Sequence, residues 1–187
     1  FCRIGSAYFN SKGFKGASLD EIAETLELTK GSFYHHVRDK DELLRHCFRR
    51  SLAIIGRTQD ESTASADSGL EALQRCAFKL FRIQNSDAGP LIRFNLIPSL
   101  SKTNRKEILT GIATVTERFG KMIKDGIDDG SVRAVNPFIA EQILISAVDL
   151  STELQWLRPL EDLQADAETY FDFYFNGIAG KRWRPAG

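Results

Sequence analysis

A run of hydroxyl, cationic and imidazole side chains near the start of the chain could bind nucleic acid. Residues 29–37 have the sequence Thr-Lys-Gly-Ser-Phe-Tyr-His-His-Val, with no carboxylate among them. Thr29 is a good helix N-cap, and Phe33 and Val37, four residues apart, would share the buried face of the helix that follows. The other positions carry hydrogen-bond donors and cations, which suit phosphate oxygens and base edges in a DNA groove.

Two further helix starts flank this segment and would position it. Ser18 and Glu21 have capping-box spacing, and an apolar stripe at helical spacing follows them. Because only a short turn separates that helix from the next, the pair is predicted to form a helix-turn-helix. Downstream, Asp39 and Glu42 repeat the spacing and start a third helix with Lys40 in its first turn, where a helix N-terminus attracts phosphate.

The ordered pattern of these residues resembles the DNA-binding domain of the TetR family of transcriptional regulators. The matching positions are Phe9, Lys12, Gly13, Phe14, Ser18, Ile22, Ala23, Leu26, Thr29 to Val37, Lys40 and Leu43. Glu27 departs from the pattern, because the family usually has glycine in this turn. The resemblance implies an all-α protein with an N-terminal three-helix DNA-binding domain, residues 1–50, and a helical domain of about six helices, residues 51–187, for effector binding and dimerisation.

The residues expected to contact DNA lie in or beside the helix-turn-helix. They are Ser18, Thr29, Lys30, Gly31, Ser32, Tyr34, His35, His36 and Lys40. Three of them match positions that grip phosphate in the family: Tyr34, His36 and Lys40. Lys30, Ser32 and His35 have tips that can reach base edges, so we expect them to recognise sequence. A solvated surface helix with no DNA contact is the plain alternative.

Composition and charge set the limits of these predictions. Of the 187 residues, 42% are hydrophobic and 27% are charged, which is ordinary for one large or two small globular domains. The net charge is zero, which taken alone counts against a nucleic-acid binder. Residues 1–50 nevertheless hold nine Lys or Arg and seven Asp or Glu, a net charge of +2, and residues 51–187 hold −2.

Neither a membrane segment nor a disulfide framework is expected. No apolar run approaches the roughly 18–20 residues of a membrane span, and no signal peptide is visible, so we expect a cytoplasmic protein without a membrane partner. The three cysteines, Cys2, Cys47 and Cys76, are odd in number and lack paired spacing. This pattern predicts free thiols in a reducing compartment.

The remainder of the chain has helical periodicity between proline and glycine breaks, and no alternating strand pattern. We predict helices over residues 40–57, 68–84 after an Asp67 cap, 103–129, 137–157 and 160–180, and a short segment over 91–97. Asn136 and Pro137 form a strong helix start, and Gly130 a strong stop. The small polar residues 58–68 predict a loop.

The resemblance implies two sites in the larger domain. An effector pocket would be lined by Phe78, Phe81, Arg93, Phe94, Phe119, Met122, Asp149 and Trp156, with Glu117, Arg118 and Glu153 as further polar candidates. Many aromatic residues can enclose an apolar pocket, so we expect a largely apolar effector, although ordinary core packing is the alternative. The last two long helices would pair with their copies in a homodimer through Ile143, Leu150, Leu154, Phe171, Tyr174 and Ile178.

Other kinds of chemistry lack the residues they need. His35, His36, His46 and Cys47 have no zinc-site spacing, so we expect no metal and no cofactor. No nucleophile stands in a hydrolase motif and no glycine loop could cradle phosphate, so we expect no catalysis.

These observations together predict a ligand-responsive transcriptional regulator, a repressor released by a small-molecule effector. It would bind a palindromic operator as a homodimer, with half-sites ~34 Å apart on double-stranded DNA. The competing hypothesis is a helical small-molecule-binding or protein-docking module that does not recognise DNA sequence. Zero net charge and Glu27 in the turn are its main support.

Overall fold

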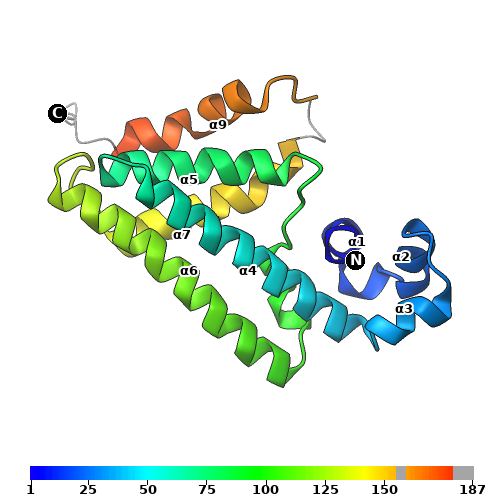
Figure 1. Cartoon of the computed structure of the whole chain (residues 1–187). Helices are drawn as coiled ribbons and strands as arrows, with labels where there is room; N and C mark the ends of the chain where they lie inside the picture. Colours follow the sequence, from blue (N-terminus) through cyan, green and yellow to red (C-terminus); the bar gives the residue numbers. More distant parts are fainter. Residues whose placement is uncertain (155–158, 179–187) are drawn as a thin grey trace. The chain divides into compact units, whose positions relative to one another are not determined.

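The structure, a computed structural model, describes residues 1–154 and 159–178, with the side chain of residue 178 left out. Every regular element in these residues is a helix (Figure 1), which confirms the predicted all-α fold. Contacts divide the chain into two compact units: unit 1 comprises residues 1–54 and 86–113, and unit 2 comprises residues 55–85 and those from 114 onward. None of the described helices combines the length and apolarity that a membrane crossing requires.

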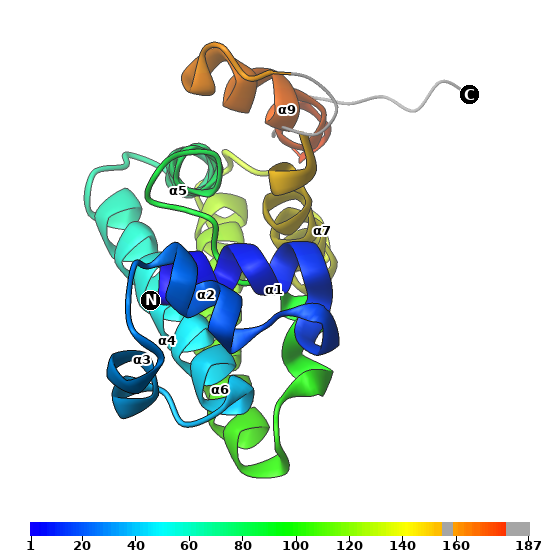
Figure 2. The same cartoon turned by 90° about the vertical axis from the view of Figure 1, so that its right-hand side faces the viewer.

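Unit 1 begins with three short helices and the start of a long one. They are α1 (Cys2–Gly16), α2 (Leu19–Thr25), α3 (Lys30–His36) and α4 (Lys40–Ala64), seen from two directions in Figures 1 and 2. Gly13 has a φ of 68°, outside the helical region, and kinks α1. The predicted helix-turn-helix is therefore present as α2 and α3.

The predicted N-caps of these helices all accept the expected backbone hydrogen bond. The Ser18 hydroxyl accepts from Glu21 at 3.5 Å, Thr29 from Ser32 at 3.2 Å, and the Asp39 carboxylate from Glu42 at 2.8 Å. Each bond satisfies a first-turn N–H that has no partner inside its helix. The caps therefore determine where α2, α3 and α4 begin.

The turn between α2 and α3 has a backbone geometry that favours glycine. Glu27 has a φ of 56°, in the left-handed region that non-glycine residues seldom occupy. The turn is held by hydrogen bonds from the N–H groups of Glu27 and Leu28 to the carbonyls of Glu24 and Ala23, at 2.9 and 3.0 Å. This geometry explains physically why glycine is usual at this position of the pattern.

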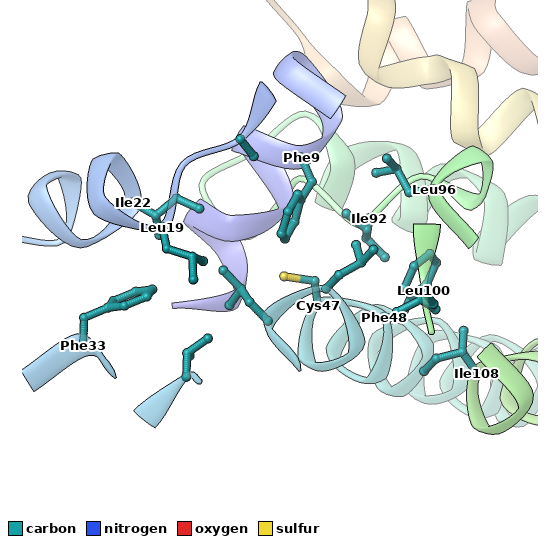
Figure 3. Close-up of a cluster of buried hydrophobic side chains, with 14 of the residues drawn as sticks. Phe9, Leu19, Ile22, Phe33, Cys47, Phe48, Ile92, Leu96, Leu100 and Ile108 are labelled. Carbon is teal, nitrogen blue, oxygen red and sulfur yellow. The ribbon is translucent and has the colours of Figure 1, made fainter. Parts of the chain in front are cut away.

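The core of unit 1 combines the first helices with residues from the middle of the chain. One cluster of buried side chains includes residues of α1 to α4 together with Ile92, Leu96, Leu100 and Ile108 (Figure 3). Here lie η1 (Phe94–Ser99) and the start of α6 (Lys102–Asp128). The compact unit therefore includes residues 86–113 as well as the predicted DNA-binding domain, whose boundary near residue 50 stays a prediction.

Unit 2 contains the remaining helices. They are the later parts of α4 and α6, α5 (Gly69–Gln84), α7 (Pro137–Leu150), η2 (Ser151–Glu153) and α9 (Leu163–Ile178). α5 packs against both α7 and α9, and its buried face includes Leu73, Leu80 and Phe81. The predicted Asn136 cap accepts from Ile139 at 3.3 Å, and Gly130, with a φ of 79°, lies just past the end of α6.

The sequence prediction fails at the end of α4. Residues 58–64 were expected in a polar loop, but α4 continues to Ala64. Thr58, Gln59 and Ser62 are buried in unit 2, and the Gln59 amide donates to the carbonyl of Val115 in α6 at 2.7 Å. Packing against a neighbouring helix thus overrides a composition that favours a loop. The helix after Pro137 is shorter than predicted: α7 ends at Leu150 and the 3-10 turn η2 follows it, while residues 155–158 lie outside the described residues.

Candidate nucleic-acid interface

The short helix α3 is amphipathic in the predicted sense. Phe33 and Val37 are buried in the core of unit 1, with Phe33 fully so. The predicted DNA contacts of this segment are all exposed: Thr29, Lys30, Gly31, Ser32, Tyr34, His35 and His36. Two buried anchors therefore hold a surface of cations, hydroxyls and imidazoles toward solvent, and Ser18, half-buried, caps the preceding helix.

A carboxylate from α2 also belongs to this surface. The Lys30 Nζ donates to Asp20 Oδ2 at 2.6 Å, and the Tyr34 hydroxyl donates to Oδ1 of the same residue at 3.2 Å. The hydrogen bond from Lys30 lowers the pKa of Asp20, and the same bond raises the pKa of Lys30. Sequence reasoning missed Asp20, because nothing local shows that the first turn of α2 lies beside α3.

The structure corrects the expected role of the Lys40 ammonium. Its Nζ donates to the carbonyls of Phe14, Lys15 and Ala17 at 3.0, 3.2 and 3.2 Å, and lies 5.3 Å from the centre of the Phe14 ring. These three bonds use all three donors of a lysine. Lys40 therefore ties the start of α4 to the end of α1, and its side chain has no donor left for phosphate in this state.

The turn from α3 to α4 is held by another ion pair. Glu42 accepts from the backbone N–H of Arg38 at 2.8 Å and from its guanidinium at 3.1 Å. These hydrogen bonds lower the pKa of Glu42 to about 2; the bonds from the Arg38 side chain have the largest effect, and the bond from its backbone N–H the next largest. The guanidinium of Arg38 is therefore paired with Glu42 within the turn between α3 and α4.

The two adjacent histidines are both on the surface. The rings of His35 and His36 lie 5.4 Å apart at 75°, and His36 also meets the Phe1 ring edge-on at 5.5 Å. Among the described residues, no three His, Cys, Asp or Glu side chains form a group that could hold a metal ion.

The residues predicted to line an effector pocket fall in both units. Arg93 and Phe94 belong to unit 1, where the Arg93 N–H donates to Asn10 and Phe94 packs on the core. The others that the structure describes are in unit 2: Phe81, Phe119 and Met122 buried, and Phe78 and Asp149 half-buried. Trp156 lies outside the described residues. The set is thus divided between the two units, and a pocket stays a prediction.

The further polar candidates are at the surface of unit 2. Glu117 and Glu153 are exposed, and Arg118 pairs with Asp60 at 2.9 Å. Arg118 also donates to the carbonyl of Gly56 at 3.3 Å. Its guanidinium is thus held by α4.

The predicted dimer residues divide into exposed and buried groups. Ile143 and Leu150 on α7 are 54% and 47% exposed, and Leu154 is half-buried. Phe171 and Tyr174 are instead buried: Phe171 packs on Phe81 of α5, and the Tyr174 hydroxyl donates to the carbonyl of Ala140 at 3.0 Å. The expectation that these two aromatic side chains face a partner is therefore corrected.

Three exposed apolar side chains escaped the sequence prediction. They are Phe138 and Ile139 on α7 and Phe173 on α9, the last 91% exposed. The sequence of α7 could have indicated them, because its apolar residues occupy more than one face of the helix and a single neighbouring helix cannot cover them all. The side chain of Ile178 lies outside the described residues.

Comparison with known proteins agrees with this geometry. Residues 5–47 match the family described as "Bacterial regulatory proteins, tetR family". Over 47 residues the chain is 43% identical to the transposon Tn10 TetC protein of Escherichia coli, a match spanning 25% of this chain and 24% of TetC. The transcriptional repressor KstR2 of Rhodococcus jostii is 24% identical over 183 residues, which cover 94% of this chain and 88% of KstR2.

Two solved structures extend the comparison to the fold. The ketosteroid transcriptional regulator KstR2 of Mycobacterium tuberculosis has a TM-score of 0.76 at 20% identity, covering 94% of this chain and 91% of that one. AibR in complex with isovaleryl coenzyme A and operator DNA has a TM-score of 0.71 at 16% identity, covering 95% and 96%. Residues 5–47 thus match the N-terminal domain of the TetR family, and the chain shares the fold of these two solved regulators.

Proposed function

We propose that this chain is a ligand-responsive transcriptional repressor that binds a palindromic operator as a homodimer and is released by a small-molecule effector. The observation that carries the proposal is α3, whose polar residues are exposed while Phe33 and Val37 anchor it in the core. A rigidly anchored helix with exposed donors is the arrangement that helix-turn-helix proteins insert into the major groove.

Different residues of this surface would contact different parts of the DNA. Tyr34, His36 and the capping Ser18 would contact phosphate and position the protein without recognising sequence. Lys30, Ser32 and His35 would contact base edges. Thr29 and Gly31 would complete the contact surface, and Lys40 would contribute its first-turn backbone N–H, since the ammonium is bound to α1.

The effector would bind in unit 2. Support comes from the neighbour AibR, whose structure contains isovaleryl coenzyme A together with operator DNA. The aromatic and sulfur side chains of this unit (Phe78, Phe81, Phe119 and Met122) would surround an apolar group, with Asp149 as a polar partner.

The homodimer would form through α7 and α9. Five apolar side chains on these helices are exposed, as expected of residues that a partner covers: Phe138, Ile139, Ile143, Leu150 and Phe173. A two-fold pair of protomers would present two copies of α3 to successive major grooves. An effector would need a coupling free energy of about 1–3 kcal/mol to change operator affinity 5–150-fold.

Fluorescence anisotropy with a labelled random-sequence duplex at low salt tests the proposal. The logarithm of the binding constant should fall linearly with the logarithm of the salt concentration, because binding releases cations from the DNA phosphates. A protein that leaves the duplex unbound at low salt would favour the competing hypothesis, a helical module that binds no DNA.

A sequence selection then tests the base contacts. A random duplex library enriched on the wild-type protein should give a palindromic site, whereas Lys30→Ala and His35→Ala should each change the preferred bases. Ser11→Ala is a suitable control, since Ser11 is exposed on α1 and donates within its own helix. Unchanged preference in both variants would remove Lys30 and His35 as the residues that recognise sequence.

A further inference from the structure

We propose that Asp20 is a specificity-determining residue of the DNA-binding surface, which competes with phosphate for Lys30 and Tyr34. Its carboxylate would keep both donors engaged on non-cognate DNA and release them on a matching operator. The inference rests on the proposed function, because it concerns the same surface.

The geometry is that of an internal substitute for phosphate. Lys30 and Tyr34 are four residues apart on α3 and so lie on the same face of the helix. Each donates to a different oxygen of Asp20, at 2.6 and 3.2 Å. A phosphate of DNA offers the same kind of charged oxygen acceptors to the same donors. The Tyr34 hydroxyl has a single hydrogen to donate, and the charge of Lys30 is already compensated by Asp20, so a phosphate has to compete with the carboxylate for both groups.

All three side chains are accessible to DNA. The side chains of Lys30 and Asp20 are 70% and 45% exposed, and Tyr34 is exposed as well. An exposed ion pair contributes little to folding, so this one can open without damaging the domain. Asp20 also places a negative charge on a surface that approaches a polyanion, and the repulsion acts within a Debye length of about 10 Å at 0.1 M salt.

The consequence differs between non-cognate and matching sites. Non-specific affinity comes almost entirely from phosphate contacts. On random DNA Lys30 has no matching base edge and would contact phosphate instead, so its pairing with Asp20 removes one such contact. On a matching site the base contacts of α3 add free energy that can offset opening of the pair. Asp20 would therefore weaken binding to random DNA more than binding to the operator.

Other carboxylates in this part of the chain have different partners. Glu21 pairs with Lys12 at 2.7 Å, and Glu42 pairs with Arg38. Glu24, exposed on the same helix α2, has no ion pair among the contacts of the described residues. Glu24→Gln is therefore a matched control: it removes the same charge from the same helix, and with it the weaker effect of Glu24 on the pKa of Lys30, but it leaves the hydrogen bond from Lys30 to Asp20 in place.

The experiment titrates a random-sequence duplex with wild type, Asp20→Asn and Glu24→Gln over a series of salt concentrations. Asp20→Asn should bind several-fold more tightly at low salt, with a logarithmic salt slope steeper by about 0.9, the value of one additional phosphate contact. Glu24→Gln should leave the slope unchanged. Equal slopes in the two variants, or weaker binding by Asp20→Asn, would overturn the inference.

A second comparison identifies the released cation. In a Lys30→Met background, Asp20→Asn should no longer steepen the slope, because no paired ammonium remains to be released. A persistent steepening would contradict the role of Lys30. A random library enriched on Asp20→Asn should also yield a less restricted set of sequences than wild type, and an equally restricted set would overturn the specificity role.

Circular dichroism melts of each variant show that the comparison is made between folded proteins. If folded wild type leaves random DNA unbound at low salt, the proposed function and this inference fail together. If wild type binds and Asp20→Asn behaves like Glu24→Gln, only this inference fails.

Discussion

At the scale of single residues, the ion pairs around α3 differ in how strongly they are held. Asp20 has two exposed partners, whereas Glu42 receives three hydrogen bonds from Arg38, one of them from the backbone. The Glu42 side chain is 16% exposed, whereas that of Asp20 is 45% exposed. Glu42 is thus a structural residue of the turn between α3 and α4, and Asp20 is available for function.

The first prediction concerns the pH dependence of folding. The pKa of Glu42 is about 2 in the folded protein and ordinarily 4.5, so its charge stabilises the folded state above pH 4.5. This stabilisation should be lost as the pH falls from 4.5 to 2. Glu42→Gln should therefore unfold at lower urea concentration than wild type at pH 7, and at nearly the same concentration close to pH 2. A difference that does not depend on pH would contradict this assignment.

Lys40 gives the second prediction at this scale. Because its ammonium holds three carbonyls at the end of α1, Lys40→Ala should lower the stability of unit 1 by about 1–3 kcal/mol. Chemical denaturation followed by circular dichroism measures the change. Lys15→Ala, an exposed lysine in the same region, is the control and should stay within about 0.5 kcal/mol of wild type. If Lys40→Ala were as stable as wild type, the hydrogen bonds from the ammonium to these three carbonyls would not contribute to folding.

At the scale of elements, small residues allow two helices of unit 2 to meet. A Cβ atom added at Gly69, the first residue of α5, would lie 2.2 Å from the backbone nitrogen of Gly126 in α6. The Gly69 N–H also donates to Asp129 at 2.8 Å, just past the end of α6. This contact joins the start of α5 to the end of α6. The sequence alone does not show that Gly69 and Gly126 lie next to each other.

The third prediction tests this close approach. Gly69→Ala should lower the free energy of unfolding by about 1–3 kcal/mol, because the backbone of α6 must move away. Gly177→Ala on α9 is the matched control, since a Cβ there meets nothing within 4 Å. The control should be neutral or stabilising by about 0.5–1 kcal/mol. Equal stability of the two variants, measured by denaturation, would show that the helices can separate at no cost.

At the scale of the whole molecule, the proposed function depends on two copies of the chain. Exposed apolar residues on α7 and α9 support the proposed dimer, whereas Phe171 is fully buried within the protomer. Phe171 contacts Phe78 and Phe81 of α5 at ring distances of 6.1 and 6.2 Å. Charged substitutions at these two kinds of position should therefore have different results.

The fourth prediction separates them. Ile143→Glu should give folded monomers with weakened binding to the operator, because one protomer offers only half of the contacts. Phe171→Glu should unfold the protein instead, since it buries an unpaired charge. Light scattering gives the mass, and circular dichroism gives the fold. A stable dimer of Ile143→Glu would place the interface elsewhere.

Local patterns account for much of what the sequence predicted. Caps, proline and glycine positions and apolar spacing act within a few residues, so α2, α3, the starts of α4 and α7 and the end of α6 follow from them. The same is true of the exposed donors of α3, because burying Phe33 and Val37 determines which side faces solvent. The sequence by itself thus determined these helices, the family resemblance and the polarity of the proposed DNA-binding surface.

Only the tertiary structure decided which of those charges are engaged and which apolar groups remain uncovered. Asp20 meets Lys30, and Lys40 meets the end of α1, through contacts between residues 10 and more than 20 positions apart. The extension of α4 and the burial of Phe171 likewise depend on neighbouring helices. The physical reason is that hydrogen bonding and burial are set by distance in space, which periodicity along one helix does not contain.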